Sequence, residues 1–166
     1  MTDLPTPRLG LPLLEPGQAQ KEMTHNEALT RLDIATQAAV LSTAATPPAS
    51  PARGQCWLVA DPAEGDWAGH ANAVAAWTDG GWRFVAPFEG MRIWAVDAQC
   101  HALFADGEWY HGRTYGRLFI EGRQLVGPQQ PNVAEPIGGV TVDAEARAAI
   151  TAVLQTLRRH GLIEEI

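Results

Sequence analysis

Turn residues divide the stretch from Gly54 to Trp109 into short hydrophobic segments, and this division constrains the fold more than any other feature of the chain. The segments are four to seven residues long, and every loop between them contains glycine, proline or aspartate. Hydrophobic segments of this length between turn residues are typical of antiparallel strands. They favour a β meander or a small barrel-like unit, with predicted strands at residues 56–60, 72–78, 82–86, 91–96 and 102–105.

One of these turns also predicts a strand register. Asp79 and Gly80 lie between two of the hydrophobic segments. Such a pair is a strong signal for a type I′ hairpin, because both central residues of that turn need a positive φ. In this register Trp77 faces Trp82 across the two strands. A cross-strand aromatic pair contributes about 0.5–1.5 kcal/mol beyond the area that it buries.

A helix is predicted before this β unit. Thr24 and Glu27 fit a capping box, in which each side chain bonds the backbone amide of the other residue. Small and aliphatic residues then recur at helical spacing as far as Ala39. Residues 18–45 are therefore predicted to be helical, up to a proline-rich linker at residues 46–53.

A second helix is predicted at the end of the chain. Asp143 is its expected N-cap, residues 144–160 form the helix, and Gly161 ends it in a Schellman motif closed by Leu162. Four hydrophobic residues in this helix recur at the spacing of a coiled-coil seam. This predicted oligomer seam consists of Ala146, Ile150, Val153 and Leu157.

Together these elements predict an α+β fold with the following organisation. An extended proline-rich arm spans residues 1–17, a helical attachment segment 18–45, a linker 46–53, a β domain 54–112, a β hairpin and loop 113–142, and a C-terminal helical segment 143–166. Prolines in the arm remove backbone donors, so the arm is expected to lie along another surface. Its leucines are the predicted partner-docking residues: Leu9, Leu11, Leu13 and Leu14.

Charge and motif content exclude several classes of function. The formal net charge is -7 and Lys21 is the single lysine, which argues against nucleic acid and against an anionic membrane surface as partners. Neither a hydrophobic run of about 20 residues nor a signal-peptide pattern is present. The sequence has no spacing typical of metal ligands, a phosphate loop or a catalytic triad, so we expect no cofactor, no metal and no catalytic residues. Cys56 and Cys100 are expected to be buried free thiols, with a disulfide as the alternative.

The six tryptophans fall into two predicted groups. The first group is expected to fill the β core: Trp57, Trp77, Trp82 and Trp94. The second group lies in polar surroundings, where an aromatic ring can stack on a sugar. Its members and their neighbours are the candidate carbohydrate-binding residues: Trp67, His70, Trp109 and Tyr110.

Several short motifs of this sequence resemble motifs of a known family. They are Gln18-Ala19-Gln20-Lys21, Thr24-His25-Asn26-Glu27-Ala28-Leu29, Leu32-Asp33, Gly65-Asp66-Trp67-Ala68-Gly69-His70, Asp79-Gly80-Gly81-Trp82-Arg83-Phe84 and Pro87-Phe88-Glu89-Gly90. Together they resemble an uncharacterised domain family of tailed-phage fibre-like proteins and of spike or fibre proteins in alphaproteobacterial gene transfer agents. The end of the chain is similar to the endings of many of the same proteins, through Val126-Gly127-Pro128-Gln129-Gln130-Pro131, Gly138-Gly139 and Asp143-Ala144-Glu145-Ala146-Arg147.

The resemblance implies a structural component of a phage-like particle. Such a protein is made in the bacterial cytoplasm, attaches to a capsid or spike-base protein, and is released with the particle. The resemblance further implies contact with host cell-surface polysaccharide and a homotrimeric assembly. Two alternatives remain open at this point, a capsular-polysaccharide-degrading enzyme and a purely scaffolding tail subunit.

Overall fold

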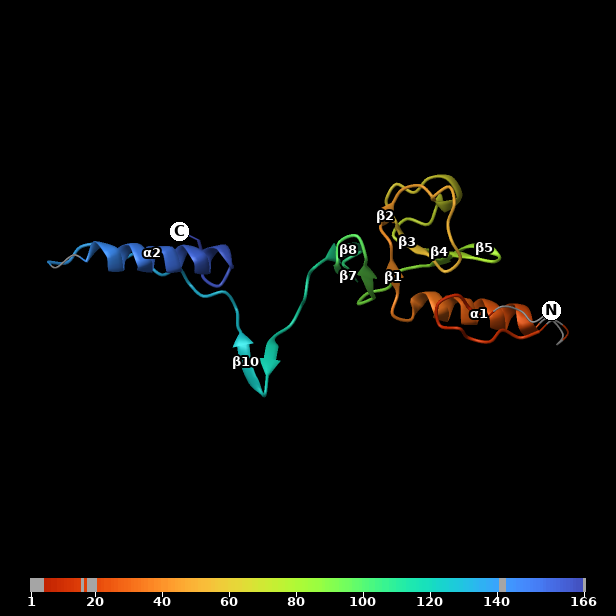
Figure 1. The fold of residues 1–166 in the computed structure, drawn as a ribbon, viewed down its shortest axis with the longest axis horizontal. Helices are drawn as coiled ribbons and strands as arrows, with labels where there is room; N and C mark the ends of the chain where they lie inside the picture. Colours follow the sequence, from red (N-terminus) through yellow and green to blue (C-terminus); the bar gives the residue numbers. More distant parts are fainter. Residues whose placement is uncertain (1–4, 16, 18–20, 141–142, 166) are drawn as a thin grey trace. The chain divides into compact units, whose positions relative to one another are not determined.

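The computed structural model describes residues 5–15, 17, 21–140 and 143–165, and the chain divides into two compact units. The N-terminal unit is Met1–Thr114 and the C-terminal unit is Tyr115–Ile166. Each unit is described by itself below (Figure 1). None of the helices in the described part of the chain is long and apolar enough to cross a membrane.

The described residues of the N-terminal unit form one α-helix, one short 3-10 helix and two four-stranded sheets. Its helices are α1 (Lys21–Ala35) and η1 (Gly65–Trp67). One sheet has the order β1-β6-β7-β8, with β1 Ala39–Val40, β6 Arg92–Ala95, β7 Cys100–Ala105 and β8 Glu108–His111. The other has the order β2-β3-β4-β5, with β2 Thr43–Ala44, β3 Cys56–Val59, β4 Val74–Thr78 and β5 Gly81–Val85.

The predicted α+β fold is confirmed, and the described strands form no closed barrel. Neighbouring strands that follow one another from β3 to β5 and from β6 to β8 pair antiparallel, as predicted. The two short strands β1 and β2 add a parallel strand to each sheet, on β6 and β3. The sheets are therefore mixed, because a single segment, residues 39–44, supplies one edge strand to each of them.

The core of the N-terminal unit has two layers. Ile34 of α1 packs with side chains of both sheets, among them Val40 of β1, Leu58 of β3 and Ile93 of β6. On the opposite face of the β2-β3-β4-β5 sheet, the loop that carries η1 covers a second cluster (Figure 1). Both faces of β3 are thus buried, which explains why all four of its residues are apolar and inaccessible.

The hairpin between β4 and β5 has the predicted register but not the predicted turn. Trp77 pairs with Trp82, and their ring centroids lie 5.0 Å apart. Neither Asp79 nor Gly80 has a positive φ, and Gly81 instead adopts φ +88°. The type I′ assignment is therefore wrong at this turn, because the glycine after the loop takes up the left-handed conformation.

Two other hairpins do carry a left-handed pair of residues. Asp106 and Gly107, between β7 and β8, have φ values of 52° and 82°. Glu121 and Gly122 join β9 and β10 and have φ values of 49° and 76°. Positive φ at both central residues is the requirement of a type I′ turn.

The N-terminal helix is shorter than predicted, and the capping box is wrong. Lys21 is the first residue of α1 and Ala35 the last, so Thr24 lies inside the helix. Glu27 forms ion pairs with Arg31 and Arg83 instead of closing a cap. The part of the predicted helix at residues 18–20 lies outside the described residues. After Ala35 the chain leaves the helix, because the backbone of β1 bonds to β6 and the backbone of β2 bonds to β3.

The described part of the N-terminal arm, residues 5–15, lies beside α1 of its own chain (Figure 1). Asp33 of α1 is fully buried, and its carboxylate accepts hydrogen bonds from the Thr6 hydroxyl and from the Arg8 and Leu9 amides. The side-chain amide of Asn26 exchanges two hydrogen bonds with the backbone of Leu14. These contacts hold the described part of the arm on α1 of its own chain.

The C-terminal unit contains the hairpin of β9 (Leu118–Ile120) and β10 (Arg123–Val126) and the helix α2 (Ala144–Arg159). The Asp143 side chain accepts a hydrogen bond from the Ala146 amide, which confirms the predicted N-cap. Gly161 has φ +66°, and the Leu162 amide donates to the Leu157 carbonyl. The predicted Schellman motif is confirmed.

Both cysteines are free. Cys56 is buried, and burial raises the pKa of its thiol to about 11. Cys100 is half-buried, so the expectation of two buried thiols is correct for Cys56 alone.

The ion pairs of Glu27 predict a pH-dependent contribution to stability. The Oε1 atom of Glu27 lies 2.9 Å from Arg31 Nε, and its Oε2 atom lies 3.0 Å from Arg83 Nε. Partial burial raises the pKa of Glu27, but hydrogen bonds from Arg83 and Arg31 outweigh it and hold the pKa below its usual value. We expect Glu27→Gln to reduce the free energy of unfolding at pH 7 by less than about 1 kcal/mol, because the groups are partly exposed.

The loss of unfolding free energy in Glu27→Gln depends on the ionised carboxylate of the wild type, so its pH dependence has a definite sign. It is fully present above the unfolded-state pKa of about 4.3, and it disappears as the pH falls through the lower pKa of the folded state. Urea unfolding of the wild type and of Glu27→Gln at pH 7 and pH 2.5 measures this loss. Glu64→Gln, at an exposed position, is the control. A deficit of equal size at both pH values contradicts the assignment.

Candidate functional site

The four candidate carbohydrate-binding residues do not form one site. Trp109 and Tyr110 are neighbours on β8, and consecutive strand residues point to opposite faces of a sheet. Trp109 pairs with Phe104 on the core face, whereas Tyr110 pairs with Leu103 on the outer face. The two remaining candidates, Trp67 and His70, belong to the loop that covers the other sheet.

Trp67 is buried, so its predicted role as an exposed sugar platform is wrong. Its exposed fraction is 0 %, and its ring centroid lies 5.2 Å from that of Trp82 and 6.4 Å from that of Trp57. The polar, glycine-rich composition of its loop indicated solvent exposure. The indole instead anchors the loop to the sheet, because burying so large a side chain is strongly favourable.

His70 is exposed and lies flat on Phe84 of β5. The ring centroids are 3.7 Å apart and the ring planes differ by 1°. One face of the imidazole is therefore occupied by a side chain of its own chain. This stacking is a structural role for His70, although its outer face remains accessible.

Trp109 lines a cleft of about 440 Å³ in the N-terminal unit. The indole Nε1 donates to the Asn72 backbone carbonyl over 2.9 Å, and the ring meets Phe104 edge to face at 5.2 Å. The polar side chains that line the cleft with it are those of Thr43, Asp61, Asn72, Glu108 and His111. Trp109 is thus fixed by packing, and one part of it borders a polar hollow.

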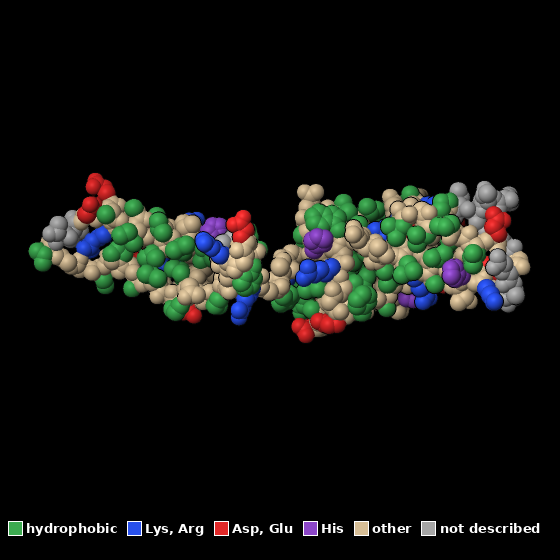
Figure 2. Space-filling view, turned by 90° about the horizontal axis from the view of Figure 1, so that it is seen from below, with side chains coloured by type: hydrophobic (Ala, Val, Ile, Leu, Met, Phe, Trp, Pro, Cys, Tyr) green, Lys and Arg blue, Asp and Glu red, His purple; other side chains and the backbone are tan. Residues whose placement is uncertain are grey.

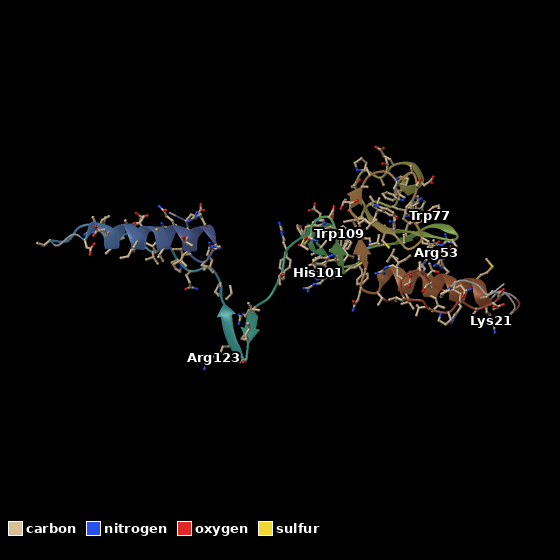
Figure 3. All side chains as sticks on the ribbon, viewed as in Figure 1. Lys21, Arg53, Trp77, His101, Trp109 and Arg123 are labelled. Carbon is tan, nitrogen blue, oxygen red and sulfur yellow. The ribbon has the colours of Figure 1, made fainter. Side chains whose placement is uncertain are left out.

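The outer face of the β1-β6-β7-β8 sheet carries a more accessible group of rings. Strand register places Arg92 and Trp94 of β6, His101 and Leu103 of β7, and Tyr110 of β8 on this face. Arg92, Trp94 and His101 are exposed there, whereas Tyr110 is half-buried and Leu103 is buried. We refer to these five residues as the aromatic face. Figure 3 labels His101 of β7 and Trp109 of β8, which belong to opposite faces of this sheet.

Trp94 is the most informative member of the aromatic face. It is 37 % exposed, so its predicted place in the core is wrong. Its ring meets that of His101 edge to face at 5.0 Å. Exposed and buried residues alternate along β6, so the polar Arg92 two positions earlier was the sequence signal for the outward direction of Trp94.

Guanidinium groups flank these rings. Arg92 is exposed on the aromatic face, and the Arg113 guanidinium carbon lies 4.1 Å from the centroid of Tyr110. A flat surface with exposed aromatic faces can stack on the apolar side of a sugar ring. The adjacent guanidinium and imidazole groups can donate hydrogen bonds to hydroxyl or carboxylate oxygens. Among the described residues, no group of three or more His, Cys, Asp or Glu side chains is arranged to hold a metal ion.

The predicted docking and assembly residues lie elsewhere. Leu9 is exposed and the other three leucines of the arm, Leu11, Leu13 and Leu14, are half-buried. Leu13 also lines a groove of about 780 Å³ bordered by α1 and by the turn between β4 and β5. On α2 the seam residues Ala146, Ile150 and Val153 are exposed and Leu157 is half-buried.

Comparison with known proteins identifies a family for the N-terminal unit. No curated protein matches the chain significantly. The family model DUF2793, described as a protein of unknown function, matches residues 25–110. The matched segment begins within α1 and includes both four-stranded sheets except the last residue of β8. Because this match covers more than half of the chain, the protein belongs to the DUF2793 family.

Proposed function

We propose that this protein is a structural spike or fibre component of a phage-like gene transfer particle and that it contacts host cell-surface polysaccharide. The particle role is supported by the motif resemblance described above. The polysaccharide contact is supported by one observation in particular, the exposure of Trp94 beside His101 on the outer face of the sheet. In this role the chain is made in the bacterial cytoplasm and leaves the cell on the particle.

The aromatic face suits a polymeric sugar better than a small ligand. It lies on the outer side of a sheet, so a long chain can cross it without entering a pocket. Trp94 offers an exposed ring, and Arg92 is exposed two residues earlier on the same strand. Ring stacking combined with charge-assisted hydrogen bonds is a chemistry that recognises glycans, including acidic ones.

Attachment to a capsid or base protein is assigned to the arm. The Leu9 side chain is 46 % exposed, although the backbone amides of Leu9 and Arg8 donate hydrogen bonds to Asp33. The groove that includes Leu13 lies along the same arm and helix. A partner that covers Leu9 and enters this groove would bury apolar surface that the chain itself leaves in water. An antibody against the chain should label purified particles if this role is correct.

Replacement of Trp94 tests the polysaccharide contact. We expect Trp94→Ala to weaken binding to capsular polysaccharide of the host at least about tenfold, a loss of about 1.4 kcal/mol, because the stacking ring is removed. Biolayer interferometry with immobilised polysaccharide measures the change. Phe88→Ala is the matched control, since Phe88 is 62 % exposed and lies outside the aromatic face.

Two results would overturn the proposal. The first is absence of binding by the wild-type chain at concentrations up to about 1 mM, where even the weakest specific contacts are detected. The second is unchanged binding by Trp94→Ala together with lost binding by Asp61→Asn, which would move the contact to the cleft beside Trp109. Release of reducing ends from the polysaccharide would favour an enzyme over a binding component.

A further inference from the structure

Positive charge lies beside the exposed ring of the aromatic face. Trp94 and His101 pair across β6 and β7, and Arg92 lies two residues before Trp94 on the same side of β6. The Arg113 guanidinium, over the ring of Tyr110, adds a second permanent positive charge. Figure 2 shows one place on the N-terminal unit where a histidine and a basic side chain lie next to hydrophobic ones. Such a group of cations stands out in a chain whose formal net charge is -7.

The guanidinium of Arg92 is not engaged by the described part of the chain. Arg92 forms no ion pair, side-chain hydrogen bond or ring contact with any residue that the structure describes. The other arginines of the N-terminal unit are engaged: Arg8, Arg31, Arg53 and Arg83 donate hydrogen bonds to oxygen atoms, and Arg113 stacks on Tyr110. The exposed Arg92 therefore offers five N–H donors to a ligand.

The acidic residues near these strands lie away from Trp94. Glu108 is the acidic residue of β6, β7 and β8, and it pairs with Ala105, two strands and two residues away from Arg92. Strand spacing of about 4.8 Å and a rise of about 3.4 Å per residue put Arg92 and Glu108 roughly 12 Å apart along the backbone sheet. Asp97, in the turn after β6, accepts a hydrogen bond from the Ala98 amide. The Debye length at physiological ionic strength is about 8 Å, so more distant acidic groups are largely screened from Arg92.

Arg92 and Trp94 are spaced to contact one sugar residue together. Alternate residues on one face of a strand lie about 7 Å apart, so a sugar ring stacked on Trp94 can present a substituent to Arg92. A planar guanidinium binds carboxylate, sulfate and phosphate groups through two parallel N–H···O bonds. An ionised oxygen accepts stronger hydrogen bonds than a neutral hydroxyl does, so an acidic sugar uses this cation best.

We propose that the ligand of the aromatic face is an anionic polysaccharide. Its carboxylate, sulfate or phosphate groups pair with Arg92, and its sugar rings stack on Trp94. His101 contributes a further N–H donor beside the stacked ring. This assignment names the chemical class of the ligand and rests on the polysaccharide contact proposed above.

Removal of the Arg92 charge tests this pairing. Arg92→Gln keeps an aliphatic stem opposite Leu103 of β7 and removes the guanidinium. We expect the variant to bind the capsular polysaccharide of the host at least about tenfold more weakly at physiological salt, because charge-assisted hydrogen bonds are lost. Biolayer interferometry with immobilised polysaccharide measures the change. Arg123→Gln, at an exposed position of the C-terminal unit, makes the same change in net charge and should bind within about twofold of the wild type.

Chemical treatment of the polysaccharide tests the same pairing from the ligand side. In one sample the carboxylates are reduced to alcohols, and in a second the sulfate and phosphate esters are hydrolysed. We expect one of these treatments to weaken wild-type binding by about the factor seen for Arg92→Gln, and the effective treatment identifies the anionic group. The same treatment should leave the affinity of Arg92→Gln unchanged, because this variant has already lost the pair.

Two results contradict an anionic ligand. The first is wild-type binding that keeps its affinity after both treatments. The second is an Arg92→Gln affinity equal to that of the wild type or of Arg123→Gln. In both cases weaker binding by Trp94→Ala still supports the polysaccharide contact, so the two failures are distinguishable. Absence of wild-type binding to the untreated polysaccharide contradicts the contact itself, and the ligand class with it.

Discussion

Replacing Asp33 by alanine is expected to lower the free energy of unfolding by about 3 kcal/mol. The carboxylate is fully buried and accepts hydrogen bonds from the Thr6 hydroxyl at 2.8 Å, the Leu9 amide at 2.6 Å and the Arg8 amide at 3.2 Å. Alanine leaves these three donors without their acceptor. The loss is large because the Thr6 hydroxyl is buried and the two amides are partly buried, so the donors lose their bonds without full solvation in exchange.

The arm should detach from α1 in the same variant. Arg8 also donates from its guanidinium to the carbonyls of Ile34 and Gln37, so the arm and the end of the helix share one network. Urea unfolding gives the free energy, and proteolysis of the arm reports its release. Asp66→Ala, at an exposed position, is the matched control and should change the free energy by less than about 0.5 kcal/mol. A loss below about 1 kcal/mol for Asp33→Ala would show that the network contributes little.

Truncation of Trp67 to alanine is expected to cost about 3–5 kcal/mol. The indole fills the space between the η1 loop and the rings of Trp57 and Trp82, and no other described residue can replace it there. Its Nε1 is buried without a hydrogen-bond partner among the described residues. Trp67→Phe should therefore cost clearly less than Trp67→Ala, because phenylalanine keeps ring contacts and removes an unpaired donor.

Trp94→Ala is the matched control for this second experiment. It makes the same substitution at a tryptophan that is 37 % exposed, so less buried surface is lost and its cost should be clearly smaller than that of Trp67→Ala. Thermal or urea unfolding of the three variants measures the difference. Equal costs at Trp67 and Trp94 would contradict the assignment of the first to the core and of the second to the surface.

Local chemistry explains which parts of the fold are predictable from the sequence. The register of the β4–β5 hairpin follows from a turn whose residues are adjacent to the strands that it joins. The N-cap at Asp143 and the Schellman motif at Gly161 follow in the same way from residues within one helical turn. In each case the energy comes from neighbours in the chain, so short patterns are sufficient.

Contacts between distant residues explain what the sequence patterns missed. Residues 39–44 continue the spacing of the preceding helix, but their backbone bonds to strands that lie 15 and 55 residues further along the chain. Trp67 lies in a loop of polar composition, and its burial depends on the ring of Trp82 fifteen residues later. Trp94 was assigned to the core by residue type, whereas its direction is set by its alternation with Ile93. The composition of a segment is therefore not sufficient to predict these positions, because each depends on the surface against which the segment packs.

The parallel pairing of β1 has a consequence for the order of events during synthesis. Ala39 pairs with Trp94, 55 residues later, whereas Thr43 in the same segment pairs with Leu58, only 15 residues later. A ribosome adds about 5–20 residues per second, so β1 waits roughly 3–11 s for its partner strand to be made. During that interval Val40, which is buried in the finished unit, can contact Cys56 and Leu58 of β3 but lacks its paired strand β6. The β1-β6-β7-β8 sheet can therefore form only after the second half of the unit has been made.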